Sequence, residues 1–214
     1  MNFPFTTEQF LDVFRAYNLA VWPAQIFLVL LALVAIFFAV YRIKYSGIII
    51  SSALSFFWFW MSIVYHFTFF SRINPFAIVF AVLFLFQGFL FFFFGIAREA
   101  LNFKFIFNVK GLTAILLFLY ALIFYPLLGY AFGHYYPSTP TFGLPCPTTI
   151  FTLGLLLLSE GKVNKVLFII PLLWALIGFT AALKLGILQD IGLLVSAILT
   201  IVFLIKDKSV TQKL

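Results

Sequence analysis

The chain consists of long apolar runs that are separated by short polar segments. Seven runs follow one another, and most of them approach the roughly 20 residues that an α-helix needs to cross a bilayer. The runs are continuous rather than alternating, which argues against lipid-facing β-strands. We therefore predict an all-α polytopic membrane bundle that forms a single transmembrane domain over residues 1–214. The expected spans are residues 20–41, 47–66, 75–96, 111–132, 147–158, 166–183 and 190–205.

A shorter amphipathic helix is predicted over residues 6–18, ahead of the first span. Thr6 and Gln9 have the spacing of a capping box, and Phe5 and Phe10 can form a hydrophobic staple. The helix either lies in the membrane interface or docks on the bundle. It contains one arginine and no lysine, whereas surface-binding helices are usually rich in both, so its composition favours docking.

Composition supports the membrane assignment and argues against other classes. Hydrophobic residues make up 65% of the chain and charged residues only 9%, whereas soluble domains carry about 25% charged residues. The net charge of +7 does not indicate nucleic-acid binding, because the basic residues are dispersed between apolar runs. The lipid bilayer is therefore the expected partner. The N-terminal sequence MNFPFTTEQF lacks the basic and apolar regions of a signal peptide.

The distribution of lysine and arginine predicts the orientation. If all seven runs cross and the N-terminus is outside, ten basic residues lie inside and three outside. If the fifth run dips in and returns, the counts become six inside and seven outside. Because basic residues near span ends favour the cytoplasm, we predict seven crossings, N-out and C-in. The ten inner residues would be Arg42, Lys44, Arg98, Lys104, Lys110, Lys162, Lys165, Lys206, Lys208 and Lys213.

The fifth run is the most informative segment. As a helix, residues 147–158 span about 18 Å, whereas the hydrocarbon core is about 30 Å thick. The preceding Pro-rich residues 137–146, which include the single cysteine Cys146, would complete the crossing. Non-helical backbone at this depth is tolerated only inside protein or beside a wet cavity. We therefore expect an outward-facing cavity, with Cys146 on its floor as the N-cap of a helix that begins at Pro147.

Four further residues are candidates for binding a ligand in this cavity. Thr148 and Thr149 lie in the first turn after Cys146, where free N–H groups and the positive end of the helix favour anions. Gln25 and Asp190 lie at matching depths in the outer half and would form walls. Two simpler interpretations remain open: Cys146 as a small buried apolar residue, and Asp190 as the cap of the last helix.

Metal binding and catalysis have little support. His66, His134 and Cys146 carry soft-metal ligand groups, but we expect His66 about 12 Å above Cys146. We therefore predict neither a metal nor a cofactor. One cysteine excludes an internal disulfide. No Ser-His-Asp order, metalloprotease motif or phosphate loop is present, so an enzyme is the less favoured class.

Two other polar or aromatic features lie within the runs. Gln87 sits deep in the third run and is expected to hydrogen-bond to a neighbouring helix. The tryptophans Trp22, Trp58 and Trp60 lie near span ends, where they are expected to anchor the chain at the interface.

Two stretches resemble a known family: TTEQFLDVFRAYNLAVWPAQ, residues 6–25, and PTFGLPCPTTIFTLGLLLL, residues 140–158. They are similar to an uncharacterised family of bacterial multi-pass membrane proteins, classed as a domain of unknown function. The resemblance covers essentially the whole chain and implies a bacterial inner-membrane setting. It supplies no activity, substrate or catalytic residue, and only directs attention to residues 22–25 and 145–149.

These observations support three hypotheses about function. The first is a small transporter, channel or receptor-like protein that binds a small ligand in an outward-facing cavity. The second is a non-catalytic subunit or assembly factor of a larger membrane complex, since the sequences FFWFW and FLFQGFLFFFF offer a Phe-rich surface. The third is a membrane thiol enzyme that uses Cys146, although no base or second cysteine accompanies it.

Overall fold

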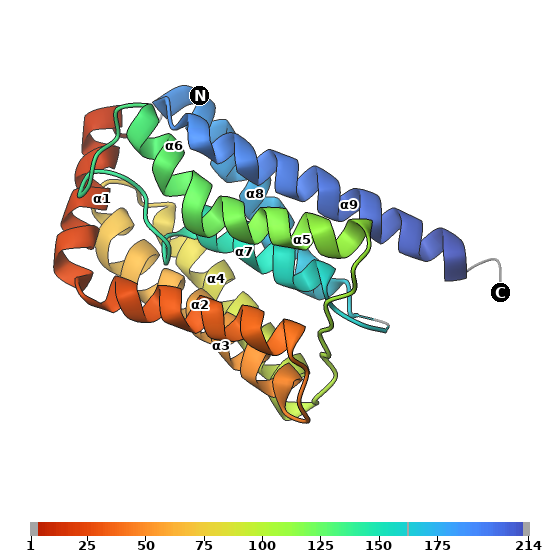
Figure 1. Ribbon diagram of the computed structural model, residues 1–214. Helices are drawn as coiled ribbons and strands as arrows, with labels where there is room; N and C mark the ends of the chain where they lie inside the picture. Colours follow the sequence, from red (N-terminus) through yellow and green to blue (C-terminus); the bar gives the residue numbers. More distant parts are fainter. Residues whose placement is uncertain (1–3, 162, 212–214) are drawn as a thin grey trace.

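The computed structural model describes residues 4–161 and 163–211, and their side chains up to Lys206. These residues form nine α-helices, whose arrangement is drawn in Figure 1. The helices are α1 (Thr7–Val21), α2 (Ala24–Val40), α3 (Ser46–Trp60), α4 (Ala77–Phe91), α5 (Val109–Leu119), α6 (Tyr125–Ala131), α7 (Pro145–Leu157), α8 (Val166–Leu185) and α9 (Ile191–Thr211). Wider π-helical turns extend three of them: η1 (Met61–Phe69) after α3, η3 (Phe92–Ala97) after α4, and η4 (Tyr120–Phe124) between α5 and α6. Two short 3₁₀ turns are η2 (Phe70–Arg72) and η5 (Leu188–Asp190).

The predicted all-α fold is confirmed over the described ranges, which contain isolated β-bridges but no strand. Among these residues, five helical stretches are long and apolar enough to cross a membrane, as expected of a membrane-embedded protein. They are Ser46–Arg72, Ala77–Ala97, Val109–Ala131, Val166–Leu185 and Leu188–Lys206. A sixth is obtained if the bent pair α1 and α2 counts as one span, while α7 is apolar but shorter.

The predicted N-terminal helix docks on the bundle, and its capping box is present. The Gln9 backbone N–H donates to Thr6 Oγ1 at 3.2 Å, and the Thr6 N–H donates to Gln9 Oε1 at 2.9 Å. The rings of Phe5 and Phe10 stack with centroids 5.6 Å apart. Val13, Phe14 and Tyr17 are among the residues that α1 buries against the bundle end.

The first predicted run does not form one straight helix, which corrects the expected span over residues 20–41. Helix α1 ends at Val21, and α2 begins at Ala24 with its axis bent by 86°. Pro23 provides the reason, because it lacks an N–H donor and forces the preceding Trp22 into an extended conformation. Figure 1 shows α1 lying across the end of the bundle rather than along it.

Helix α7 is the central helix of the bundle. It packs against α5, α8 and α9, and twelve of its thirteen residues are buried. A helix that is apolar on every face belongs in a core. Because neighbours surround it, α7 does not need the length of a lipid-facing span.

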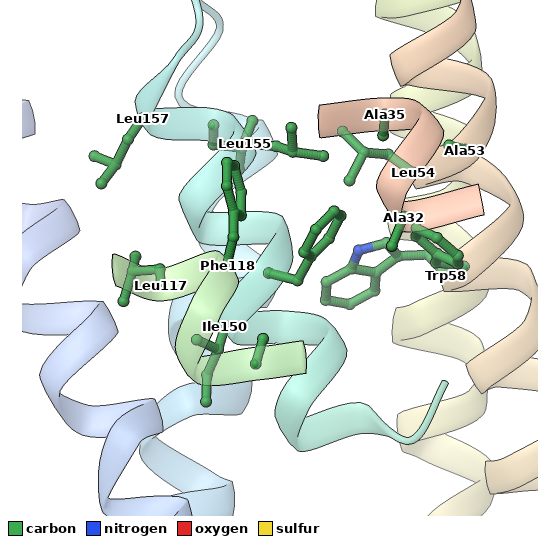
Figure 2. Close-up of a cluster of buried hydrophobic side chains, with 14 of the residues drawn as sticks. Ala32, Ala35, Ala53, Leu54, Trp58, Leu117, Phe118, Ile150, Leu155 and Leu157 are labelled. Carbon is green, nitrogen blue, oxygen red and sulfur yellow. The ribbon is translucent and has the colours of Figure 1, made fainter. Parts of the chain in front are cut away.

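The core around α7 joins it to α2, α3, α4 and α5 (Figure 2). Trp58 of α3 is fully buried, lies 4.5 Å from the Phe84 ring between centroids, and donates its Nε1–H to Thr152 Oγ1 at 3.1 Å. This burial corrects the expectation that Trp58 anchors the chain at the membrane interface. The interhelical bond expected of Gln87 is confirmed, since its Nε2 donates to the Leu167 carbonyl at 3.1 Å.

Replacing Thr152 with valine is expected to lower the free energy of unfolding by about 1–3 kcal/mol, because the buried Trp58 N–H loses its acceptor. The measurement is unfolding of the purified protein in mixed micelles. Thr68→Val is the matched control, since the exposed Thr68 hydroxyl bonds only to Ile63 O within its own helix. Equal stability of the two variants would contradict an important role for the Trp58–Thr152 bond.

The end of the bundle opposite α1 is held together by the connection between α4 and α5. Leu101 and Phe103 of this segment are buried. The Lys104 N–H donates to Leu158 O at 2.8 Å, and the Phe105 N–H donates to Ala39 O at 2.9 Å. These backbone bonds fasten the C-terminal ends of α2 and α7 to the connection.

Candidate functional site

A cavity of about 370 Å³ lies at the α1 end of the bundle. Its walls come from α1 and the residues before it, η1 and η2, the start of α4, the residues before α7 and its first turn, the second half of α8, and η5. The lining is mainly aromatic and aliphatic and includes Phe5, Phe14, Phe70, Phe80 and Ile177. The size falls in the range of about 300–1,000 Å³ that is usual for small-molecule sites.

Polar groups meet at one place in this apolar cavity. Cys146 and Asp190 line it together with Trp174 and Gly178. A Cβ atom added to Gly178 would lie 3.7 Å from both Cys146 Sγ and Trp174 Nε1, so these two groups lie next to each other beside the glycine. Trp174 Nε1 is buried and has no hydrogen-bond partner within the described residues. We call Cys146, Trp174, Gly178 and Asp190 the polar floor.

Asp190 is held in place by groups from two other helices. The Tyr125 hydroxyl donates to Asp190 Oδ1, and Cys146 lines the same cavity beside this carboxylate. Asp190 is 4% exposed and directly precedes α9. It therefore lies at the start of the last helix, where a carboxylate is favourable, and it also lines the cavity. For Asp190, a position at the start of the last helix and a position in the cavity wall are therefore compatible.

The expected cap of α7 is corrected by the structure. Leu144 is the N-cap, Pro145 is the first helical residue, and Cys146 already lies inside the first turn. A proline suits the first helical position because its φ is preset and its missing N–H needs no partner there. Of two prolines that satisfy this rule, the earlier one, Pro145, begins the helix.

Thr148 and Thr149 do not line the cavity. Thr148 Oγ1 accepts the Gly143 N–H at 3.0 Å and so fixes the loop that precedes α7. Thr149 Oγ1 is buried and has no hydrogen-bond partner within the described residues. The structure therefore places these hydroxyls among the packing contacts of α7.

Gln25 also lies outside the cavity, in a hydrogen-bond network centred on Asn18. Gln25 Nε2 donates to Asn18 Oδ1 at 2.6 Å and to Thr141 Oγ1 at 3.0 Å. Asn18 Nδ2 in turn donates to the carbonyls of Pro137 and Thr139 at 2.6 and 2.7 Å. The network ties the loop between α6 and α7 to the corner between α1 and α2, and Figure 1 shows this loop beside α1.

The two histidines do not line the cavity. His66 is fully buried in η1 between aromatic rings, with centroids 4.5 Å from Phe84 and 5.1 Å from Trp174. Neither of its ring nitrogens has a hydrogen-bond partner in the part of the chain that the structure describes. His134 lies in the loop after α6, close to Gln189. The described part of the chain contains no group of three His, Cys, Asp or Glu residues that could hold a metal ion.

Sequence reasoning missed Tyr125, Trp174 and Asn18. Tyr125 and Trp174 lie inside apolar runs, where their polar atoms need partners. Asn18 precedes the Trp22–Pro23 break by one turn, on the otherwise apolar face of α1. A polar atom in an apolar stretch indicates that a hydrogen-bond partner is needed, but it does not identify the residue that provides it.

Comparison with known proteins gives the chain a family without a function. Searches of curated proteins and of solved structures found no match. One family model matches residues 7–213, and it describes a family of unknown function, DUF6064. The uncharacterised family that the sequence resembled is thereby confirmed. The match covers nearly the whole chain, which therefore belongs to the DUF6064 family of unknown function.

Proposed function

We propose that this protein is a transporter or receptor-like protein of the bacterial inner membrane that binds a small amphipathic amine in the cavity above the polar floor. The observation that carries the proposal is the placement of the Asp190 carboxylate in a mainly apolar cavity. The aromatic walls offer hydrophobic contact to a hydrocarbon group. The carboxylate favours a cationic or hydrogen-bond-donating head group.

The proposed topology has seven crossings, with the α1 end outside and the C-terminus inside. Basic residues are concentrated at the end opposite α1, as the cytoplasmic side requires. Helix α7 measures about 20 Å, and the loop that precedes it completes its crossing. This loop is supported as buried protein backbone by Asn18 and Thr148, which is the condition for non-helical chain at membrane depth.

The cavity is closed on the inner side, which favours a binding protein over an open channel. Helix α7 fills the centre of the bundle, and the connection between α4 and α5 packs across its inner end. Phe76, which directly precedes α4, and Thr180 of α8 line the cavity and are exposed. They provide an entrance near the outer end of the bundle.

The single cysteine provides a direct test. A small membrane-impermeant cationic methanethiosulfonate, added to right-side-out vesicles, is expected to modify Cys146 from the outside. Octylamine is expected to slow this reaction at least tenfold, octanol less, and octanoate least, because the amine alone combines the hydrocarbon chain with a group attracted to Asp190. Mass spectrometry of the intact protein measures the modification.

Cys146→Ser is the control for reaction at this site. Modification from the inside only would contradict the orientation. Equal protection by octylamine and octanoate would contradict recognition by charge, whereas protection by neither would contradict binding in the cavity.

A further inference from the structure

Four buried polar atoms near Gly129 have no hydrogen-bond partner within the described residues. They are Thr139 Oγ1, Gln189 Nε2, Gln189 Oε1 and His134 Nδ1. A Cβ atom added to Gly129 would lie 2.9 Å from Thr139 Oγ1 and 3.3 Å from Gln189 Nε2, so two of these atoms face one spot beside the glycine. The His134 backbone N–H donates to Gly129 O at 2.9 Å, which brings the imidazole to the same corner.

Ordered water is the usual partner of such atoms. A buried water needs about two to four polar partners, and the Thr139 hydroxyl, the Gln189 amide and the His134 ring provide them. Gln189 is 1% exposed, whereas His134 is partly exposed. The group therefore leads from the surface at the α1 end into the interior, and none of its members lines the cavity.

This polar group adjoins Asp190 along α6. Tyr125, which donates to Asp190, precedes Gly129 by one helical turn on the same face of α6. Gln189 precedes Asp190 in the turn η5, which packs against α6. We propose that water bound beside Gly129 carries protons between the solution at the α1 end and the Asp190 carboxylate. In the net reaction, a hydronium ion in the solution loses a proton and the Asp190 carboxylate gains one, so that water and a neutral carboxyl group result.

The titratable groups around Asp190 allow its carboxylate to accept an incoming proton. The titratable groups that act on it from the neighbouring elements are Tyr120 and Tyr125 on the α5–α6 stretch, Cys146 on α7, and Tyr65 on η1. Tyrosine and cysteine are ordinarily uncharged at neutral pH. These groups therefore offer no positive charge that would repel a proton.

His134 is suited to the entrance of the route. Partial burial lowers the pKa of its imidazole below the usual 6.5, and the nearby Gln189 side chain opposes this shift. At neutral pH the ring is therefore mostly uncharged, and one of its nitrogens is free to accept a hydrogen bond from water.

Infrared spectroscopy of the full chain in lipid nanodiscs tests the proposal without any ligand. The carboxyl band of Asp190 is assigned by its loss in Asp190→Asn, and its growth is followed after a rapid fall in pH. Gly129→Ala places a methyl group against Thr139 Oγ1 and Gln189 Nε2 and so crowds the proposed water site, and Gln189→Leu removes two of the polar atoms. Both variants are expected to slow the growth of the band at least tenfold.

Leu127→Ala, at an exposed position of α6, is the matched control and is expected to keep the wild-type rate. Wild-type rates in both Gly129→Ala and Gln189→Leu would overturn the proposal, as would an Asp190 carboxyl band that is absent at every pH tested. If one of the two variants does not fold, the other still tests the proposal. Because no amine is present, this proposal and amine binding can fail independently.

Discussion

Replacing Asp190 with asparagine is expected to weaken octylamine binding by about 10- to 100-fold, while octanol binding changes little. A hydrogen bond to a charged group contributes about 1.5–3 kcal/mol, and each 1.4 kcal/mol corresponds to about tenfold in affinity. The asparagine carbonyl can still accept the Tyr125 hydroxyl, so the shape of the polar floor is retained. Protection of Cys146 from thiol modification, measured over a range of octylamine concentrations, gives the affinity.

Asp12→Asn is the matched control, because Asp12 is an exposed carboxylate on α1 outside the cavity lining. It is expected to bind octylamine as the wild type does. If Asp190→Asn kept its preference for octylamine over octanol, recognition by the carboxylate would be refuted. An equal loss for both compounds would also count against it, since that result indicates a deformed cavity.

Replacing Asn18 with alanine is expected to lower the free energy of unfolding by about 2–5 kcal/mol. The substitution leaves the carbonyls of Pro137 and Thr139 without their donor, and it removes the acceptor that Gln25 and Thr141 share. Each buried polar group left unpaired costs about 1–3 kcal/mol. Water that enters the gap pairs with some of these groups, so the expected loss of stability is smaller than the sum of the separate costs.

Unfolding in mixed micelles measures the effect, and Asn164→Ala is the matched control. Asn164 is exposed, and its side chain accepts only the nearby Val166 N–H at 3.1 Å. The Asn18 variant is also expected to react faster at Cys146, because the loop that it releases contributes Pro140 to the cavity wall. Equal stability of the Asn18 and Asn164 variants would show that the network contributes little to the fold.

Local sequence rules predicted the features that depend on neighbouring residues. The capping box of Thr6 and Gln9 is a contact across three positions, and the apolar runs contain their own backbone hydrogen bonds. The same rules failed where two signals competed. Either Pro145 or Pro147 satisfies the preference for proline at the first helical position, and Trp58 fits an interface anchor as well as a core residue.

The cavity and the network around Asn18 depend on contacts between distant parts of the chain. Asn18 and Thr139 are separated by 121 positions, and Tyr125 and Asp190 by 65. The 86° bend between α1 and α2 decides which of these residues can meet. It carries α1 across the bundle end, where its phenylalanines form one wall of the cavity.

The sequence by itself determined that this is an all-α protein with apolar helices long enough for a membrane, an N-terminal amphipathic helix and an unusual segment around Cys146. Hydrophobicity and helix caps act over a few residues, so the linear pattern is sufficient to predict them. Only the tertiary structure decided that Cys146 and Asp190 share a cavity while Gln25, Thr148 and Thr149 lie outside it. The direction in which a buried polar side chain points depends on which helix packs against it, and helix packing is a property of the whole bundle.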